Sequence, residues 1–304
     1  MLGKMLLRLV LDDLDTDEVS DEYADRRKLF DCLDQAAAMF VRETGLLRAT
    51  KEITTVADSQ SYVLPPDFIN LYVRDSMGNF YIRYTDADEN DNHPCLTSYD
   101  LIFRANNTES EETPCRFAVM DQAAKSSVIT GTASSAGAQA DDGSCVLTDS
   151  TKAFTGANLV YPRDVIHNTT DGSYGYVLEV TDDTHLEVAL FEGTDNDFTS
   201  SDAYVIQPGS QYQLILDYPS ATAGHTITVP YVCMPSPVYH DTGWWRFNPR
   251  HCRAIVSGAA TLFKMPKREF SEAAQIGGLF AQEITRSRQE RAVQILSRKN
   301  RNRR

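Results

Sequence analysis

Long hydrophobic runs are missing from this sequence of 304 residues, although 42% of its residues are apolar. No uninterrupted apolar stretch approaches the about 20 residues that a helix needs to cross a bilayer. The short apolar start reaches acidic residues at Asp12 and offers no small-residue cleavage site, so it does not read as a secretory signal. We therefore expect no membrane partner, and a chain with enough apolar residues for a folded core.

Closely spaced cysteines are also missing. No two cysteines form a C-x-x-C pair, and a chain of this size does not need a disulfide framework. We expect buried free thiols in a reducing compartment. The six cysteines are Cys32, Cys95, Cys115, Cys145, Cys233 and Cys252.

Sequence signatures of catalysis are absent as well. There is no glycine-rich phosphate loop, no G-x-S-x-G elbow, no H-E-x-x-H motif and no Cys/His pair at the spacing of metal ligands. The six histidines are scattered, and we expect a polar surface position for each. The sequence therefore predicts a protein that is not an enzyme and has no catalytic residue, no cofactor and no metal site.

Two acidic patterns come closest to a site. Segment 86–97 has the Asp/Asn alternation of a calcium loop, but Asp91 replaces the required glycine and Thr97 replaces the closing glutamate. The pairs at 182–183 and 195–197 could serve a glycosidase, which uses two carboxylates at a set separation. Aspartates between short strands are explained equally well by hydrogen bonds within turns. We favour the turn interpretation.

Acidic side chains become scarce towards the end of the chain. Residues 246–304 hold 14 basic and 4 acidic side chains, whereas residues 1–245 hold 15 basic and 39 acidic ones. The stretch 286–304 carries eight of the basic residues and one acid, Glu290. Such a tail can attract copies of the chain, an acidic partner or nucleic acid, or it can be a solvated end.

Helical periodicity marks residues 20–44, where apolar residues recur at steps of three and four and form one stripe. Ser20 or Asp21 can cap the start of this helix, and Gly45 suits a left-handed stop. After it, β-branched and aromatic residues predict strands, the second and third of which form a hairpin. These strands are expected near 52–56, 69–75, 79–84, 99–105 and 115–120.

Residues 126–207 are predicted to form an inserted module. A stretch rich in Gly, Ser and Ala opens it, and short alternating strands follow with Asp-Gly and Asp-Asp turns between them. This pattern predicts a small antiparallel β-barrel or sandwich looped out of a host domain. The host then comprises residues 1–125 and 208–304.

The C-terminal part is predicted to be helical. Pro249 stands in the first turn of an apolar stripe that runs to Phe263, and Pro266 should break or kink this helix. A second helix is expected from Lys267 to Leu296. The fold class is therefore α+β, with N- and C-terminal helices around a small antiparallel β-core and an inserted all-β barrel or sandwich.

Tryptophan is scarce, and both copies stand together shortly before Pro249. Trp244, Trp245 and Phe247 form a cluster with an arginine, which is typical of interface anchors. The same rings could equally serve as a staple that packs the start of the helix against the β-core.

Three blocks of the sequence resemble the head-to-tail connector (adaptor) proteins of tailed bacteriophages. They are the acidic helix that ends in the RETG-type turn at 42–45, a Y-x-L-P-x-D-F phrase, and the aromatic-Pro-Arg segment at 245–263 that leads into the C-terminal helices. In addition, segment 126–207 is similar to a β-module that recurs in phage structural proteins. The residues that carry the central phrase are Tyr62, Leu64, Pro65, Asp67 and Phe68.

The resemblance implies a virion protein of the neck, assembled in the host cytoplasm as a homo-oligomeric ring that is usually twelve-fold. Such a ring lies beneath the portal protein, contacts a downstream neck or tail protein, and lets double-stranded DNA pass during ejection without sequence-specific binding. The C-terminal segment is then the portal-binding element. Its basic residues are Arg286, Arg288, Arg291, Arg298, Lys299, Arg301, Arg303 and Arg304.

The charge of the body agrees with such a passage, because acidic walls do not hold the phosphate backbone of DNA. An alternative is a tail-associated carbohydrate-binding or fibre protein, with 126–207 as the binding unit. A glycan hydrolase that uses the paired aspartates is a third hypothesis, which predicts an activity that single substitutions abolish.

Overall fold

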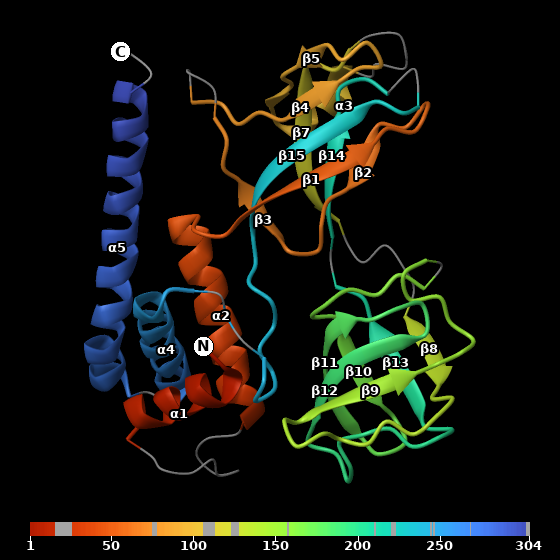
Figure 1. Cartoon of the computed structure of the whole chain (residues 1–304), viewed down its shortest axis with the longest axis vertical. Helices are drawn as coiled ribbons and strands as arrows, with labels where there is room; N and C mark the ends of the chain where they lie inside the picture. Colours follow the sequence, from red (N-terminus) through yellow and green to blue (C-terminus); the bar gives the residue numbers. More distant parts are fainter. Residues whose placement is uncertain are drawn as a thin grey trace. The chain divides into compact units, whose positions relative to one another are not determined.

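The computed structural model has a mixed α+β fold, as the sequence predicted (Figure 1). It describes residues 1–15, 26–74, 78–105, 113–122, 128–156, 158–209, 211–219, 223–243, 245, 247–267 and 269–301. The chain divides into two compact units. We call them the helix–barrel unit (residues 1–44, 128–208 and 235–304) and the two-sheet unit (residues 45–127 and 209–234).

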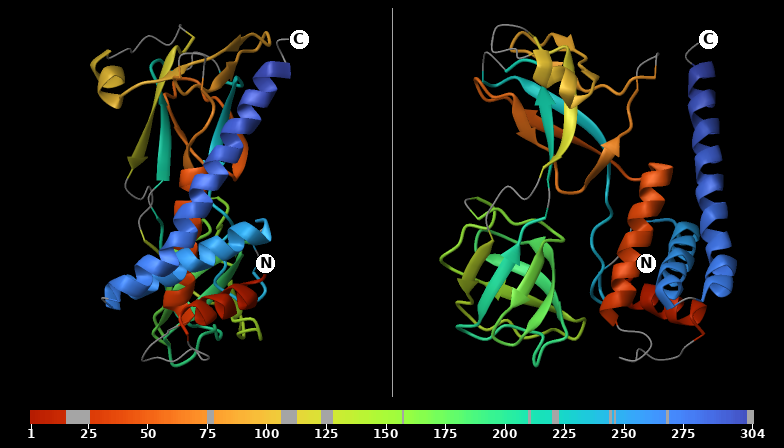
Figure 2. Two further views of the ribbon diagram at one scale, coloured as in Figure 1. Left: turned by 90° about the vertical axis from the view of Figure 1, so that its left-hand side faces the viewer. Right: turned by 180° about the vertical axis from the view of Figure 1, so that it is seen from behind.

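Four α-helices and a short 3-10 helix belong to the helix–barrel unit. They are α1 (Gly3–Asp13), α2 (Arg26–Thr44), α4 (Pro249–Lys264), η1 (Met265–Lys267) and α5 (Phe270–Arg301). Helix α1 runs crosswise to α2, and α5 continues well beyond the end of α2 (Figures 1 and 2). The break between α4 and α5 confirms the prediction made for Pro266.

Helix α2 confirms the predicted apolar stripe. Leu29, Phe30, Leu33 and Phe40 are all fully buried and pack with α1 and α4 in one core. The helix ends at Thr44, and Gly45 follows with a φ of 60°, the left-handed conformation that glycine adopts without strain. The predicted caps Ser20 and Asp21 lie outside the described residues, and helix α1 was not foreseen from the sequence.

Residues 129–207 form a curled half-barrel of six antiparallel strands in the order β8-β13-β10-β11-β12-β9, which confirms the predicted barrel or sandwich. Its inward side chains form a core of their own, with Phe154, Phe198 and Tyr204 as the largest members. The strands are β8 (Ile129–Thr132), β9 (Ser144–Thr148), β10 (Val165–Asn168), β11 (Ser173–Val180), β12 (His185–Phe191) and β13 (Ala203–Gln207).

Polar contacts fix the half-barrel to helix α2. The guanidinium of Arg163 donates to both carboxylate oxygens of Asp34, at 2.9 and 2.8 Å, and also to the carbonyl of Pro235 at 2.5 Å. Arg27 of the same helix pairs with Glu192, directly after β12, at 3.3 Å. Helix α2 therefore has two distinct faces. One face is apolar and packs against helices, and the other is charged and contacts the half-barrel.

The two-sheet unit holds two sheets that share one apolar core. In the first sheet, the central strand β15 (Thr226–Cys233) pairs with β1 (Arg48–Thr54), β3 (Phe68–Leu71) and β4 (Arg83–Thr85), and β4 pairs with β5 (Asp91–Asn92). The second sheet has the order β2-β14-β7-β6, with β2 (Ser61–Val63), β14 (Gln211–Leu216), β7 (Arg116–Gln122) and β6 (Cys95–Leu96). Strand β7 confirms the strand expected near 115–120.

One prediction for this unit is wrong, and another holds only in part. Residues 99–105 form a helix, α3 (Tyr99–Ala105), because their apolar residues are consecutive instead of alternating and Ile102 is the one that packs inward. The predicted hairpin of 69–75 with 79–84 is present only as an antiparallel bridge between Arg74 and Phe80 and a hydrogen bond from the amide of Tyr81 to the carbonyl of Val73. Strands β3 and β4 themselves pair with β15, a strand from far along the chain.

Candidate interface at the C-terminal helices

The start of helix α4 is set by local chemistry. The side chain of Asn248 accepts a hydrogen bond from the amide of Arg250 at 3.1 Å, and Pro249 occupies the first helical position, where its missing N–H costs nothing. The carbonyl of Asn248 accepts from His251 and Cys252. The aromatic-Pro-Arg segment thus works as a capped helix start.

The aromatic residues before this cap pack inside the chain. Trp245 is 2% exposed, and its indole N–H donates to the carbonyl of Ser236 at 3.3 Å. The backbone of Trp245 exchanges hydrogen bonds with Met1, and the ring of Phe247 stands edge-on to Trp245 at 5.7 Å. This is the packing expected of a staple, although against helices instead of the β-core. A role of Trp245 and Phe247 towards a partner stays a prediction, and Trp244 lies outside the described residues.

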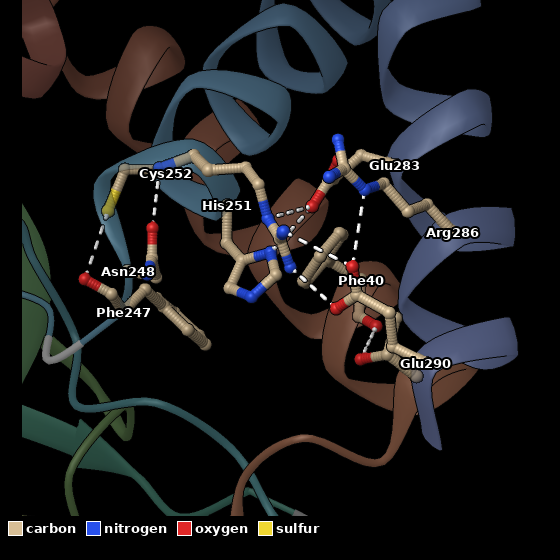
Figure 3. Close-up of polar contacts among 10 residues, drawn as sticks. Phe40, Phe247, Asn248, His251, Cys252, Glu283, Arg286 and Glu290 are labelled. Atoms are coloured by element: carbon tan, nitrogen blue, oxygen red, sulfur yellow. Dashed lines mark hydrogen bonds and ion pairs between the residues drawn. The ribbon is translucent and has the colours of Figure 1, made fainter. Parts of the chain in front are cut away.

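A charged cluster joins the start of α4 to α5 (Figure 3). Glu283 lies 2.7 Å from Nε of Arg250 and 3.0 Å from Nδ1 of His251. Two turns further along α5, Glu290 pairs with Arg250 at 2.9 Å and with Arg286 at 3.2 Å. The cluster therefore ties two helices together through alternating charges.

His251 is the buried member of this cluster, which corrects the expected surface position for that histidine. It is 8% exposed and lies against the ring of Phe40 at 5.4 Å. Burial lowers the pKa of His251, the positive charge of Arg250 lowers it further, and Glu283 opposes both. The imidazole therefore resists protonation although a carboxylate is adjacent.

Helix α5 is also tied to the end of α2. Nε of Arg288 donates to the carbonyl of Glu43 at 3.0 Å, and its guanidinium pairs with the carboxylate of the same residue. Two of the predicted portal-binding residues, Arg286 and Arg288, thus make ion pairs within the chain. Arg291, Arg298, Lys299 and Arg301 lie on α5, further along the helix, and Arg303 and Arg304 lie outside the described residues.

The partners of these arginines were not singled out from the sequence. Glu283, Arg286 and Glu290 are spaced by three, four and seven residues, which places them on one helix face, and this spacing was the available signal. Glu43 lies on α2 and Arg250 on α4. No local pattern within α5 could therefore show that these two residues are the partners of Arg288 and of Glu283 and Glu290.

The Y-x-L-P-x-D-F phrase forms a corner of the two-sheet unit. Tyr62, Leu64 and Phe68 are buried, and the ring of Phe68 stacks on Tyr231 at 5.7 Å. Asp67 accepts a hydrogen bond from the hydroxyl of Tyr231 at 3.0 Å. The carbonyl of Pro65 accepts from the amide of Phe68 at 3.0 Å, which closes the turn.

Hydrogen bonds engage members of two of the acidic patterns, those at 86–97 and 182–183. Asp86 accepts from the amides of Asp88 and Asn90, and Asp182 accepts from the amide of Thr184 and lies 2.8 Å from His185. Asp183 accepts from the hydroxyl of Thr155. Within the described ranges, no group of three or more His, Cys, Asp or Glu side chains is placed to hold a metal ion.

The cysteines are free, as expected, but they are not all buried. Cys145 and Cys252 are buried, whereas Cys115 is exposed because it stands in the loop just before β7. Among the described residues, no helix is both long and apolar enough to cross a membrane.

Comparison with known proteins identifies the N-terminal part of the chain. No curated protein matches the sequence. The model of the SU10 adaptor protein family matches residues 4–125, which include α1, α2 and the Y-x-L-P-x-D-F phrase. The family consists of structural phage adaptors that are not known as enzymes, which suggests a virion component that assembles with head or tail proteins. Residues 4–125 thus match the SU10 adaptor protein family, a family of phage head-tail connectors.

Proposed function

We propose that this protein forms a ring, twelve-fold as in the connectors it resembles, that joins the portal of the capsid to the next neck or tail protein. The family match over residues 4–125 is the observation that carries this proposal. The arrangement of charge supports it, since the body up to residue 245 has a large acidic excess and could line a passage without holding DNA.

We further propose that the end of α5 is the portal-binding element. Arg286 and Arg288 are engaged with Glu290 and Glu43, so they hold α5 in place. Beyond Glu290, the helix carries Arg291, Arg298, Lys299 and Arg301 and continues past α2 (Figure 2). Docking of a helix end of this charge suits an acidic groove on a partner.

Imaging of the chain mixed with purified portal tests the proposal. We expect rings stacked on the portal by negative-stain microscopy, and a chain that ends at Glu290 should lose portal binding while keeping its fold. An Arg288→Ala variant is the matched control. It also removes a basic side chain of α5, but one that pairs with Glu43 within the same chain. Portal binding by the shortened chain would refute the role of the helix end.

The absence of any complex between the full chain and the portal would refute the connector role itself. The carbohydrate-binding alternative stays a prediction, and glycan binding by the full chain would favour it. A substrate turned over by the purified protein would contradict a structural role.

A further inference from the structure

The outer face of the half-barrel carries a depression of about 380 Å³. Its lining comes from three neighbouring strands, β10, β11 and β13, and from the turn between β10 and β11 (Figure 1). We call this depression the outer pocket, and its volume lies in the lower part of the range of small-molecule sites. The described residues that line it are Val165, His167, Gly172, Tyr174, Val205 and Gln207.

Strand register builds the outer pocket from two rows of side chains. Tyr174 pairs with His167, and His167 pairs with Val205 on its other side. The next row places Val165 opposite Gln207. Side chains that stand directly opposite each other in antiparallel strands project to the same face and lie close together. The pocket therefore follows from the pairing of three strands.

The pocket lies on the face of these strands that is turned away from the half-barrel core. Ile166 and Ile206 alternate with the lining residues and are fully buried in that core. On the opposite face, Val165 is 40% exposed. Packing of the core thus does not account for the apolar side chains of the pocket, which leaves them available to a ligand.

Contacts with α2 fix the aromatic wall of the pocket. The guanidinium of Arg27 lies over the ring of Tyr174, 4.5 Å from its centroid, and the hydroxyl of Tyr174 donates to Glu192. Glu192 in turn pairs with Arg27 at 3.3 Å. The rings of Tyr174 and His167 are nearly perpendicular, with centroids 6.3 Å apart. Tyr174 is therefore oriented before any ligand arrives, which lowers the entropic cost of binding.

The chemistry of the lining favours a neutral ligand. No Asp, Glu, Lys or Arg is among the described lining residues, and the nearby Arg27 and Glu192 are paired with each other. A charged ligand would therefore lose its water without gaining a counter-charge.

The same lining favours a ligand that has both an apolar face and hydroxyl groups. An apolar side chain would suit the two valines and the tyrosine ring, but it would remove water from His167 and Gln207 without replacing those hydrogen bonds. A side-chain amide and a neutral imidazole each offer a donor and an acceptor. The hydroxyl groups around the edge of a sugar ring can satisfy both.

We propose that the outer pocket binds one neutral sugar ring. The apolar C–H face of the sugar lies against Tyr174 and the valines, and its hydroxyl groups bond to His167 and Gln207. This binding activity goes beyond the proposed connector function and does not depend on it. The half-barrel lies outside residues 4–125, so its ligand is not given by the match to the adaptor family.

Isothermal titration of the full chain with separate sugars tests the proposal. The probes are D-glucose, D-mannose, D-galactose and N-acetyl-D-glucosamine. We expect at least one of them to bind with a dissociation constant of about 1 mM, as for a small ligand that buries little surface. The proposal is overturned if none of these sugars binds.

Variants of the full chain locate the bound sugar. His167→Ala with Gln207→Ala should weaken binding about tenfold, as expected for the loss of two hydrogen bonds. Val165→Ser should weaken it at least about threefold, because it removes apolar contact. Val146→Ser on β9 is the matched control, since Val146 is 42% exposed on the same half-barrel and is not among the described lining residues. This control should bind the sugar like the unaltered chain.

Circular dichroism melting verifies that each variant is folded. Equal affinity of the unaltered chain and the double variant would place the sugar elsewhere and overturn the proposal. Binding of N-acetyl-tryptophanamide in place of any sugar would assign the pocket to an apolar side chain of a protein partner and would also overturn it. Portal binding is measured on the same samples. A chain that binds portal but no sugar contradicts only this inference, and a chain that binds a sugar but no portal contradicts only the connector function.

Discussion

At the scale of single residues, the structure shows how strongly context decides what a polar side chain does. His251 and His185 belong to the same six scattered histidines, yet His251 is buried against Phe40 while His185 sits in an Asp-rich turn. The burial of His251 follows from its place one turn into α4, on the face that meets α2 and α5. The residue type, histidine, therefore does not by itself predict whether the side chain is buried or exposed.

Acidification should destabilise the helix–barrel unit through His251. Because the folded pKa lies below the ordinary value of 6.5, the unfolded chain takes up the proton first. The stability contribution is complete above that ordinary value and is lost as the pH falls through it towards the folded pKa. We expect the Tm to drop between about pH 7.5 and pH 5.5 and the drop to be smaller in a His251→Gln variant. If the Tm of the unaltered chain and the Tm of the His251→Gln variant fell equally with pH, His251 would not be the cause of the acid destabilisation.

Glycine positions in the helices should respond in opposite ways to alanine. A Cβ at Gly3 would lie 2.0 Å from the carbonyl oxygen of His240, a backbone atom, so Gly3→Ala should destabilise the protein by about 1–3 kcal/mol. Gly278 has nothing within 4 Å of its Cβ position inside α5, so Gly278→Ala should stabilise by up to about 1 kcal/mol. Urea unfolding of both variants measures the difference. A neutral Gly3→Ala would show that residues 1–4 can move away from segment 240–245 at little cost.

At the scale of elements, α2 organises the helix–barrel unit. Its apolar face is buried by α1 and α4, and its charged face receives Arg163 from the loop before β10. Arg163 itself adopts a φ of 77°, an uncommon conformation for a residue with a side chain, and its bidentate contact with Asp34 holds it there. The half-barrel is thereby attached through the Arg163–Asp34 pair, the Arg27–Glu192 pair and the apolar residues around them.

Removal of that contact should be measurable. The side chains of Arg163 and Asp34 are 20% and 13% exposed, so Arg163→Ala leaves a largely buried carboxylate unpaired. After allowance for partial solvent access we expect a loss of about 1–3 kcal/mol in unfolding free energy. Arg8→Ala is the control, since its pair with Asp12 is exposed and should matter by less than about 0.5 kcal/mol.

A double-mutant cycle with Asp34→Ala isolates the interaction itself. Additive losses from the two substitutions would mean that the pair contributes nothing, and the half-barrel would then be held by its other contacts, such as the Arg27–Glu192 pair and the apolar residues.

At the scale of the whole molecule, opposite charges are separated along the chain, with the acidic excess before residue 245 and the basic excess after it. Opposite charge in one chain can attract other copies, an acidic partner or nucleic acid. The ion pairs of Arg286 and Arg288 use part of the basic charge to hold α5, and the remainder follows beyond Glu290.

Portal binding through the end of α5 should therefore weaken as salt is added. Exposed charges are screened over about 10 Å at 0.1 M salt and over about 3 Å at 1 M salt. We expect the affinity for portal to fall steadily over this range, as measured by biolayer interferometry, while the Tm of the chain changes little. Affinity that rises with salt would indicate an apolar contact in place of the proposed ionic one.

Local patterns in the sequence determined α2 with its stop at Gly45, the start of α4 at Pro249, the break at Pro266 and the β-content of residues 129–207. Each of these features depends on residues within a few positions of one another, so the hydrophobic periodicity and the backbone preferences that produce it are visible in the sequence. The resemblance of the Y-x-L-P-x-D-F phrase to phage connectors is of the same kind, because it lies within seven consecutive residues, 62–68.

Tertiary structure alone decided which distant segments meet. Strand β15 pairs with both β3 and β4, so the predicted hairpin between their segments is reduced to the bridge at Arg74 and Phe80. Residues 99–105 form a helix that packs on a sheet through Ile102. Glu43 met Arg288, and Glu283 met both Arg250 and His251. Such pairs form because burial of the surrounding apolar surface brings the segments together. The hydrophobic effect is non-directional, so the local sequence does not show which distant segments it joins.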